Sequence, residues 1–226
     1  MTILLNSVLE LLNYPSIIVF CIISFIIGSI PFGLIITKIS GYGDIRKIGS
    51  GNIGATNVLR TGNKLLALLT LLLDISKSFA FLYFVKINFI LILEKELLII
   101  LYVLISILSL LGHMFSPFLL LKGGKGIATS AGILFFMNWI GASVILFVWL
   151  IVALKYKTSS LGALSASFIA PIIFWFLYKI NVIENLFYVT NTSILEVYLI
   201  LIISILIWIK HISNIKRLIS GTESKI

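Results

Sequence analysis

Long apolar segments alternate with short polar ones along the whole chain. The apolar segments cover residues 16–37, 65–86, 97–118, 127–154, 160–178 and 194–210. Most of them have about the 20 residues that an α-helix needs to cross a bilayer. Because backbone polar groups in lipid must pair within their own segment, this pattern predicts an all-α polytopic membrane protein. We expect a single domain over residues 1–226.

Two of these segments contain interruptions. The first carries Gly28, Pro31 and Gly33 in its second half, which predicts a kink or a close helix contact there. Residues 127–154 would form a helix of about 42 Å, longer than a bilayer core of about 30 Å requires. Asn138 lies in its middle. We therefore expect a short half-span over 127–137 and a separate span over 139–154.

The distribution of basic residues favours seven spans, with the half-span included. If the N-terminus lies outside, most of the 17 Lys and Arg fall in loops on the cytoplasmic side, and only Lys86, Lys95 and Lys179 fall outside. A single helix over 127–154 would instead place Lys155, Lys157 and the C-terminal tail outside. Since cytoplasmic loops are rich in Lys and Arg, we expect a cytoplasmic C-terminus.

Composition narrows the possible functions. Hydrophobic residues make up 60% of the chain and charged residues 11%, far from the values of a soluble domain. The net charge of +9 reports membrane orientation, so we expect no nucleic-acid partner. Cys21 is the only cysteine and excludes a disulfide. The two histidines are far apart in the sequence and lack a carboxylate pair, so we expect no metal and no cofactor. Residues 1–15 contain no Lys or Arg, unlike a signal peptide.

Three polar motifs interrupt this apolar background, and the first covers residues 49–60 (GSGNIGATNVLR). Its glycines permit backbone turns in which successive N–H groups converge on an anion. Arg60 supplies a forked cation that suits phosphate oxygens. An ordinary connecting loop is the alternative. The candidate anion-binding residues are Gly49, Ser50, Gly51, Asn52, Gly54, Thr56, Asn57 and Arg60.

The second motif, residues 122–126 (KGGKG), opens a helix. A glycine backbone at a helix N-terminus attracts phosphate, and Lys125 adds a point charge. The motif lacks the first glycine of a Walker A loop, and a simple positive anchor is the alternative. The candidate residues here are Gly123, Gly124, Lys125 and Gly126.

The third motif follows the last apolar segment and contains His211 and Asn214. They lie three positions apart and share a helix face, which makes them candidates for polar substrate contact. Snorkelling cations at the membrane edge are the alternative, which we prefer for Lys210.

Charged residues inside the apolar segments are also candidates. Asp74 and Lys77 lie three positions apart, so each can neutralise the other. Intramembrane ionisable residues often serve function, but a helix-locking pair is at least as good an interpretation, so we expect them to support the site. His113 precedes the second motif and can either donate to substrate or support the loop.

The three motifs together resemble the bacterial acyl-phosphate:glycerol-3-phosphate acyltransferases. The resemblance rests on GSGNIGATNVLR, on residues 112–132 (GHMFSPFLLLKGGKGIATSAG) and on residues 211–224 (HISNIKRLISGTES), and it extends from Gly28 to Glu223. It implies an inner-membrane enzyme that transfers a fatty acyl group from acyl-phosphate to the 1-hydroxyl of glycerol 3-phosphate. The product is lysophosphatidic acid, the first step of phospholipid synthesis. The partners it implies are the two substrates, membrane lipid and the soluble enzyme that makes acyl-phosphate.

By the same resemblance, the site residues are Ser50, Asn52, Arg60, Lys125, His211, Asn214 and Glu223. This chain departs from the family at two positions. Ala163 occupies a place where the family often has serine, and Ser160 can cover part of that role. Ser78 occupies a place where the family has glycine, which predicts the loss of a close helix contact.

Acyl-phosphate is a mixed anhydride with a good leaving group, so no covalent nucleophile is needed. The proton acceptor for the attacking hydroxyl is either His211 or a substrate phosphate oxygen, and the resemblance favours the phosphate. A membrane transporter of a phosphorylated small solute is the main alternative function. It should show internal halves and midplane discontinuities, whereas polarity here gathers at one face.

Overall fold

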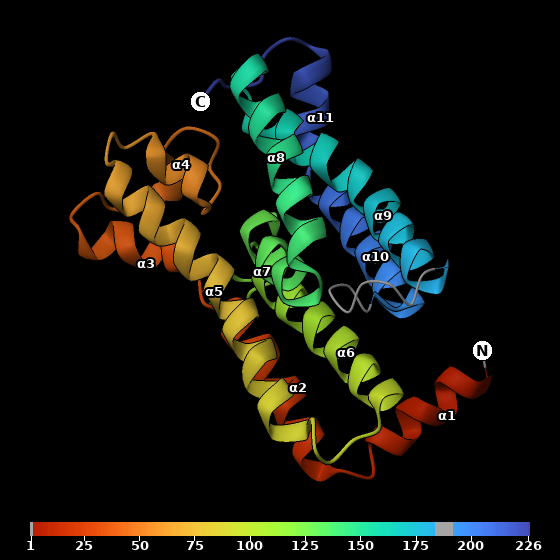
Figure 1. Cartoon of the computed structure of the whole chain (residues 1–226). Coiled ribbons are helices and arrows are strands. Elements are labelled where there is room, and N and C mark those ends of the chain that lie inside the picture. Colours follow the sequence, from red (N-terminus) through yellow and green to blue (C-terminus); the bar gives the residue numbers. More distant parts are fainter. Residues whose placement is uncertain (1, 184–191) are drawn as a thin grey trace.

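The computed structural model describes residues 2–183 and 192–226, and these residues form helices joined by short loops (Figure 1). The α-helices are α1 (Thr2–Leu11), α2 (Pro15–Ser29), α3 (Phe32–Ile39), α4 (Ala55–Leu59), α5 (Lys64–Phe89), α6 (Lys95–Met114), α7 (Ile127–Met137), α8 (Trp139–Tyr156), α9 (Ser159–Ile183), α10 (Ile194–Lys210) and α11 (Ile212–Ile219). Two 3₁₀ turns, η1 (Ile45–Lys47) and η2 (Pro117–Leu119), lie in the loops. The predicted all-α class is confirmed, while α1 was not predicted.

Four of the described helices are long and apolar enough to cross a membrane singly: α5, α6 with its following turn, α8 and α9. Two bent pairs, α2 with α3 and α10 with α11, reach that length only when each pair is counted as one span. This gives up to six spans, and α7 is a shorter apolar helix. The count of seven, which includes α7, stays a prediction, as does the placement of the termini.

Both predicted interruptions are confirmed. The chain bends by 46° between α2 and α3, where Pro31 cannot continue the hydrogen-bond ladder. Asn138 lies between α7 and α8, and its side chain accepts a hydrogen bond from Gly141 N at 2.9 Å as the N-cap of α8. Its amide nitrogen donates to Thr192 Oγ1 at 3.0 Å. Asn138 thus ends one helix and begins the next.

Small residues set the closest helix crossings. At the α2–α6 crossing, a Cβ on Gly28 would lie 2.1 Å from Ser109 O, and one on Gly112 would lie 2.2 Å from Phe25 O. Ser24 Oγ also donates to Ile105 O at 2.8 Å across this crossing. Close backbone approach with interhelical hydrogen bonds is the usual way in which membrane helices associate.

We expected a close helix contact to be missing, because Ser78 stands where the family has glycine. The close contact is present. A Cβ on Gly132 of α7 would lie 2.2 Å from Ile75 O of α5, so the smaller residue comes from the other helix. Ser78 Oγ donates to Thr129 O at 2.8 Å and ties the same two helices together. That prediction was therefore wrong: Gly132 of α7 allows the close approach, and Ser78 of α5 adds a hydrogen bond.

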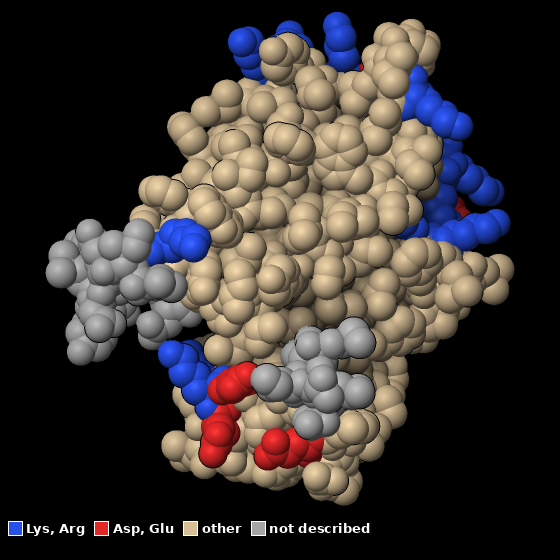
Figure 2. Space-filling view, turned by 90° about the vertical axis from the view of Figure 1, so that its right-hand side faces the viewer, with Lys and Arg blue, Asp and Glu red and all other residues tan. Residues whose placement is uncertain are grey.

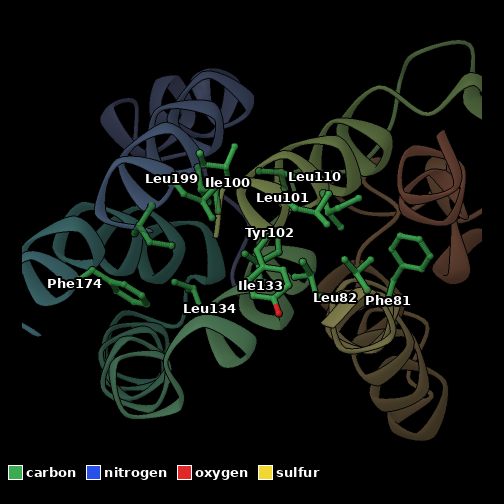
Figure 3. Packing of buried hydrophobic residues seen from close by; sticks show 14 of the residues in the cluster. Phe81, Leu82, Ile100, Leu101, Tyr102, Leu110, Ile133, Leu134, Phe174 and Leu199 are labelled. Carbon is green, nitrogen blue, oxygen red and sulfur yellow. The ribbon is translucent and has the colours of Figure 1, made fainter. Parts of the chain in front are cut away.

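The buried apolar core runs along the bundle between α5, α6, α7, α9 and α10 (Figure 3). It contains Phe81 and Leu82 of α5, Leu101 of α6, Ile133 of α7 and Phe174 of α9. A smaller apolar cluster holds the loop between α3 and α5, with Ile45, Ile53 and Val58 among its members. Many large apolar side chains outside both clusters are exposed, as expected for a surface that faces lipid.

Charged residues lie mostly at the two ends of the bundle. In Figure 2, Lys and Arg gather at the top and upper right, and carboxylates gather at the bottom, with a broad uncharged surface between them. The end rich in Lys and Arg is the end at which α3, α4 and α11 lie in Figure 1. The polar motifs of the sequence belong to this end.

Candidate active site

The three sequence motifs surround one cavity of about 370 Å³. Ser50, Lys125 and His211, one from each motif, all line it. One wall comes from the loop before α4, from α4 and from the first half of α5, and the opposite wall comes from α8, α9 and the segment after α11. Other lining residues are Asn52, Gly54, Thr56, Asn57, Arg60, Lys64, Asp74, His113, Gly126, Trp149, Ser159, Ser160, Ala163, Asn214, Glu223, Ser224 and Ile226.

Asn57 holds the first motif in shape. Its amide nitrogen donates to Ile45 O and Ile48 O at 3.0 Å each and to Asn52 O at 2.7 Å. Its Oδ1 accepts from Ser50 N at 3.0 Å and from Arg60 Nη1 at 3.1 Å. With only 2% of its surface exposed, Asn57 serves as the internal scaffold of this loop. It also lines the cavity, and its phosphate contact stays a prediction.

Two N–H groups of the predicted anion-binding nest in the first motif are turned away from the cavity. Ser50 N–H points to Asn57 Oδ1, and Gly51 N–H donates to Ile48 O at 3.0 Å, so both donors are already used. Gly49 and Gly51 do not line the cavity, and both have positive φ angles, +53° and +71°. These glycines make the tight turns of the loop. At Gly49 a Cβ would also lie 2.6 Å from Cδ of Arg60.

The second motif places Lys125 against the third. Its ammonium donates to Oδ1 of Asn214, and the side chain lies in the cavity wall. Burial lowers the pKa of Lys125 to about 8, with Arg217 and Arg60 adding to the shift and Glu223 opposing it. Loss of solvent disfavours the charged form of an amine. Lys125 is therefore a cation whose charge is poorly screened.

Gly123 and Gly124 serve close packing and do not line the cavity. Added Cβ atoms would lie 2.1 Å from His113 O at Gly123 and 2.2 Å from His113 Nε2 at Gly124. Gly124 N also donates to His113 O at 3.0 Å. Gly126 differs from them: its φ is +84°, it precedes α7, and it lines the cavity. The motif thus lies directly on the end of α6.

Glu223 joins the third motif to α9. Its Oε1 accepts from Ser160 Oγ at 2.8 Å and from Asn214 Nδ2 at 2.6 Å, and its Oε2 accepts from Arg217 Nε at 2.7 Å. Burial raises the pKa of Glu223, but these hydrogen bonds and Arg217 outweigh it and lower that pKa below its ordinary value. Ser160 therefore binds a protein carboxylate. Asn214 links Lys125 to Glu223.

His211 is oriented by its own helix. Its Nδ1 lies 2.8 Å from Ile207 O. A carbonyl oxygen can only accept, so Nδ1 carries the proton and Nε2 is left as an acceptor in the neutral ring. The side chain is 2% exposed and lines the cavity. His211 can therefore accept a proton in this cavity.

The predicted neutralisation of Asp74 and Lys77 is confirmed. Lys77 Nζ lies 2.8 Å from Asp74 Oδ1, with 1% and 3% of the two side chains exposed. Lys77 Nζ also lies 2.8 Å from His113 Nδ1. Asp74 and His113 line the cavity, whereas Lys77 lies behind them. Lys210, which we interpreted as a snorkelling cation, instead donates to Met114 O at 2.9 Å.

A second, almost wholly apolar cavity of about 190 Å³ adjoins the first. It runs between α5, α7, α8, α9 and α10, and its wall includes Ile75, Phe135, Ala142, Ala166, Ala170 and Ile203. Leu71, Ile127, Ala128, Trp149 and Ala163 line both cavities. Ala163, the position where the sequence departs from the family serine, thus lies at the junction.

Sequence reasoning missed several residues of this site. Ser159 Oγ lies 3.1 Å from Thr56 Oγ1 and joins the first motif to the start of α9. Trp149 lines both cavities from the middle of an apolar helix, where no sequence signal distinguishes it. Arg60 Nη2 lies 3.5 Å from Ser224 O and Lys225 O. Among the described residues, no group of three His, Cys, Asp or Glu is placed to hold a metal ion.

Known proteins are similar to this chain in both sequence and fold. The pattern of the glycerol-3-phosphate acyltransferase family matches residues 18–221. A glycerol-3-phosphate acyltransferase of Mesorhizobium japonicum is 42% identical over 91% of this chain and 93% of its own length. A glycerol-3-phosphate acyltransferase of Bartonella henselae is 45% identical over 91% of this chain and 89% of its own length.

Two solved structures have the same fold. One is PlsY (YgiH), an integral membrane glycerol 3-phosphate acyltransferase, in its glycerol 3-phosphate form: TM-score 0.78, 32% identity, and coverage of 93% of this chain and 96% of that one. The lysophosphatidic acid form of PlsY matches with a TM-score of 0.76 and 31% identity, and the match covers 93% of this chain and 95% of that one. This similarity to an integral membrane protein, together with the apolar helices, shows that the protein is a multi-pass membrane protein. The chain belongs to the glycerol-3-phosphate acyltransferase family.

Proposed function

We propose that this protein transfers a fatty acyl group from acyl-phosphate to the 1-hydroxyl of glycerol 3-phosphate and releases lysophosphatidic acid and inorganic phosphate. The observation that carries the proposal is the pair of joined cavities. The cavity of about 370 Å³, which has Arg60 and Lys125 in its wall and which we call the polar cavity, shares five lining residues with the apolar one. A phosphate group and an acyl chain on one molecule require this combination.

The polar cavity suits the phosphoryl groups of both substrates. Arg60 offers a planar fork and Lys125 a point charge, and both act more strongly where little water screens them. Ser50 and Asn52 add neutral hydrogen-bonding groups in the same wall. One of the PlsY structures is the glycerol 3-phosphate form, and we extend that substrate to this chain on the strength of the family and the cavity.

The reaction needs no covalent enzyme intermediate. The glycerol hydroxyl oxygen attacks the acyl carbonyl carbon, the bond from that carbon to the phosphate oxygen breaks, and inorganic phosphate leaves. The hydroxyl proton passes to a phosphate oxygen or to His211 Nε2, which is unprotonated in the neutral ring. Holding hydroxyl and carbonyl together supplies much of the rate. Arg60 and Lys125 stabilise the charge on the departing phosphate.

The apolar cavity suits the acyl tail. It lies between α5, α7, α8, α9 and α10, and Ala142, Ala166 and Ala170 leave space between helices where larger side chains would fill it. Transfer of a CH₂ group from water to such a site contributes about 0.8 kcal/mol. The soluble enzyme that makes acyl-phosphate would supply the donor. The transporter alternative is not supported by any described feature of the cavity.

The direct test is an assay with purified protein. We expect palmitoyl-phosphate and glycerol 3-phosphate to give lysophosphatidic acid and phosphate in the absence of added metal or CoA. Palmitoyl-CoA serves as the matched donor control, because it carries the same acyl chain on a thioester. Transfer from palmitoyl-CoA with none from palmitoyl-phosphate would contradict the proposed donor.

Activity should fall on the basic side as Lys125 loses its proton. Its pKa of about 8 in the free protein predicts that kcat/KM for glycerol 3-phosphate declines as pH rises through about 8, because only the ammonium form attracts phosphate. The pH dependence of kcat/KM reports groups of the free enzyme. In Lys125→Arg, whose guanidinium stays charged, the decline should move to higher pH. If kcat/KM of that variant declines at the same pH as that of the wild type, the decline reports the titration of another group.

We also propose that the site faces the cytoplasm of a bacterial cell and that the protein lies in the inner membrane. The concentration of Lys and Arg at the end of the bundle near the site supports this orientation. The test is cysteine labelling in a Cys21→Ala background. Lys155→Cys should react only with reagent on the cytoplasmic side. Leu91→Cys, which is 94% exposed between α5 and α6, should react only from outside, and the reverse pattern would invert the topology.

A further inference from the structure

The apolar cavity has the same depth along four of the helices that enclose it. On each of α7, α8, α9 and α10, one lining residue lies near the polar cavity and another lies seven positions deeper: Ile127 and Leu134, Trp149 and Ala142, Ala163 and Ala170, and Ile207 and Ile200. Seven positions at about 1.5 Å each give a depth of about 10 Å. Ile127, Trp149 and Ala163 also line the polar cavity, so these three residues mark the shallow end.

A packed aromatic ring closes the deep end of this cavity on α9. Phe174 lies one turn beyond Ala170, is fully buried and does not line the cavity (Figure 3). A Cβ added to Gly141 of α8 would lie 3.1 Å from Phe174 Cε2, so the ring packs directly against the neighbouring helix. Among the residues that the structure describes in α8 and α9, none deeper than Ala142 and Ala170 lines the cavity. Phe174 is therefore part of the cavity floor.

Two polar residues lie at the same level as this ring. Asn138 and Glu196 are one turn deeper than the last lining residues of α8 and α10, and they are 6% and 7% exposed. Asn138 Nδ2 donates to Thr192 Oγ1 at 3.0 Å. Glu196 Oε2 accepts from Ser193 N at 2.9 Å. Because an apolar chain at this level would separate buried polar groups from their partners, an acyl tail has reason to stop above them.

Above this floor the apolar cavity reaches the surface that faces lipid. Leu71 of α5 and Leu146 of α8 both line the cavity, and they are 39% and 47% exposed. Both α5 and α8 pack against α7, which is shorter than either of them. The part of a long tail that exceeds the depth of the cavity therefore has a path into the bilayer between α5 and α8.

We propose that the apolar cavity encloses about the first nine carbons of the acyl chain, that Ala170 contacts the end of this enclosed part, and that Phe174 sets its depth. The inference rests on the proposed acyl transfer, in which phosphate in the polar cavity and the tail in the apolar one place the carbonyl between them. C–C bonds of about 1.5 Å advance an extended chain by about 1.25 Å per carbon. A depth of about 10 Å then holds about eight carbons beyond the carbonyl. The rest of a longer tail lies in the bilayer.

Two alanines on one face of α9 provide a matched test. Ala166 and Ala170 line the cavity and are 7% and 4% exposed, and Ala170 lies about 6 Å deeper, the length of about five acyl carbons. Each enclosed CH₂ contributes about fourfold to binding, and a leucine side chain displaces several of them. In Ala170→Leu we expect kcat/KM to fall more than about tenfold with decanoyl- and palmitoyl-phosphate and to change little with hexanoyl-phosphate. In Ala166→Leu the fall should already appear with hexanoyl-phosphate.

The ratio of variant to wild-type kcat/KM for each donor removes differences in donor solubility. Phe168→Leu places a leucine on the same helix at a position that is 65% exposed and lines neither cavity, and its ratio should not depend on donor length. Equal losses with every donor in Ala170→Leu, or no loss with any, would overturn the proposed depth. Failure of the wild-type protein to use any acyl-phosphate would instead count against the proposed function, and the same series of acyl-CoA donors would then test the depth by itself.

Photolabelling of the wild-type protein covers the case in which the leucine variants do not fold. The probes are two palmitoylphosphonates, one with a diazirine at the ninth carbon and one with a diazirine at the last carbon. In lipid vesicles we expect the first probe to label the protein near Ala142 and Ala170, and the second to label lipid and the exposed faces of α5 and α8. Labelling of lipid alone by the first probe, or of Thr192 or Glu196 by the second, would overturn the proposal.

Discussion

Arg60→Ala and Lys125→Ala are each expected to reduce kcat/KM for acyl transfer by about 10³-fold, because removal of one preorganised charge donor from a dry site typically costs 10²–10³-fold. Both cations line the polar cavity, Arg60 from the end of α4 and Lys125 from the loop before α7, so neither can substitute for the other's position. Arg60 is further held by Asn57 Oδ1 at 3.1 Å, and Lys125 is held by Asn214.

The two substitutions should leave the fold intact, since neither side chain belongs to the apolar core. The measurement is the initial rate of lysophosphatidic acid formation, with thermal unfolding of each variant in detergent as a check. The matched controls are Lys47→Ala in the loop before the first motif and Lys122→Ala in the second, both exposed cations outside the cavity. We expect wild-type rates in the controls. A large loss in all four variants would indicate a general requirement for surface charge.

Gly124→Ala is expected to reduce activity more than 10²-fold and to lower the unfolding temperature. The new Cβ would lie 2.2 Å from His113 Nε2, and the ring cannot easily move, because Lys77 holds its other nitrogen. Either the loop that carries Lys125 or the histidine must shift. A displacement of about 1 Å in a positioned group can cost about 10²-fold in rate.

Gly54→Ala is the matched glycine control. Gly54 lines the same cavity, but its φ is −79° and an added Cβ would meet only Asn52 Nδ2 at 3.7 Å, an ordinary van der Waals distance. We expect its activity to stay within about threefold of wild type, with a small effect at the start of α4. Equal losses at Gly54 and Gly124 would indicate that both glycines contact substrate through their backbones, as the sequence pattern suggested.

Several features of the fold could be predicted from the sequence because they depend on local physics. The helices follow from apolar segments of bilayer length. The bend at Pro31 follows from a missing N–H, and the break at Asn138 follows from a polar residue in an overlong segment. The pairing of Asp74 with Lys77 follows from their spacing on one helix face. Each of these conclusions needs only neighbouring residues.

The glycines show where such reasoning fails. Four of the predicted phosphate-binding residues, Gly49, Gly51, Gly123 and Gly124, do not line the cavity, and they shape loops or allow close approach. A glycine that binds an anion through its N–H and a glycine that makes room for a neighbour have the same sequence signal. The neighbour decides between them. Here it is Arg60 for Gly49, and His113 for Gly123 and Gly124.

The sequence by itself determined the membrane class of this protein, its helix breaks and the three motifs that carry polar chemistry, because these depend on composition and on spacing within one segment. Only the tertiary structure decided that the motifs share one cavity, that an apolar cavity adjoins it at Ala163, and that Lys77 contacts His113. Those features arise from contacts between helices far apart in the chain, which no local pattern encodes.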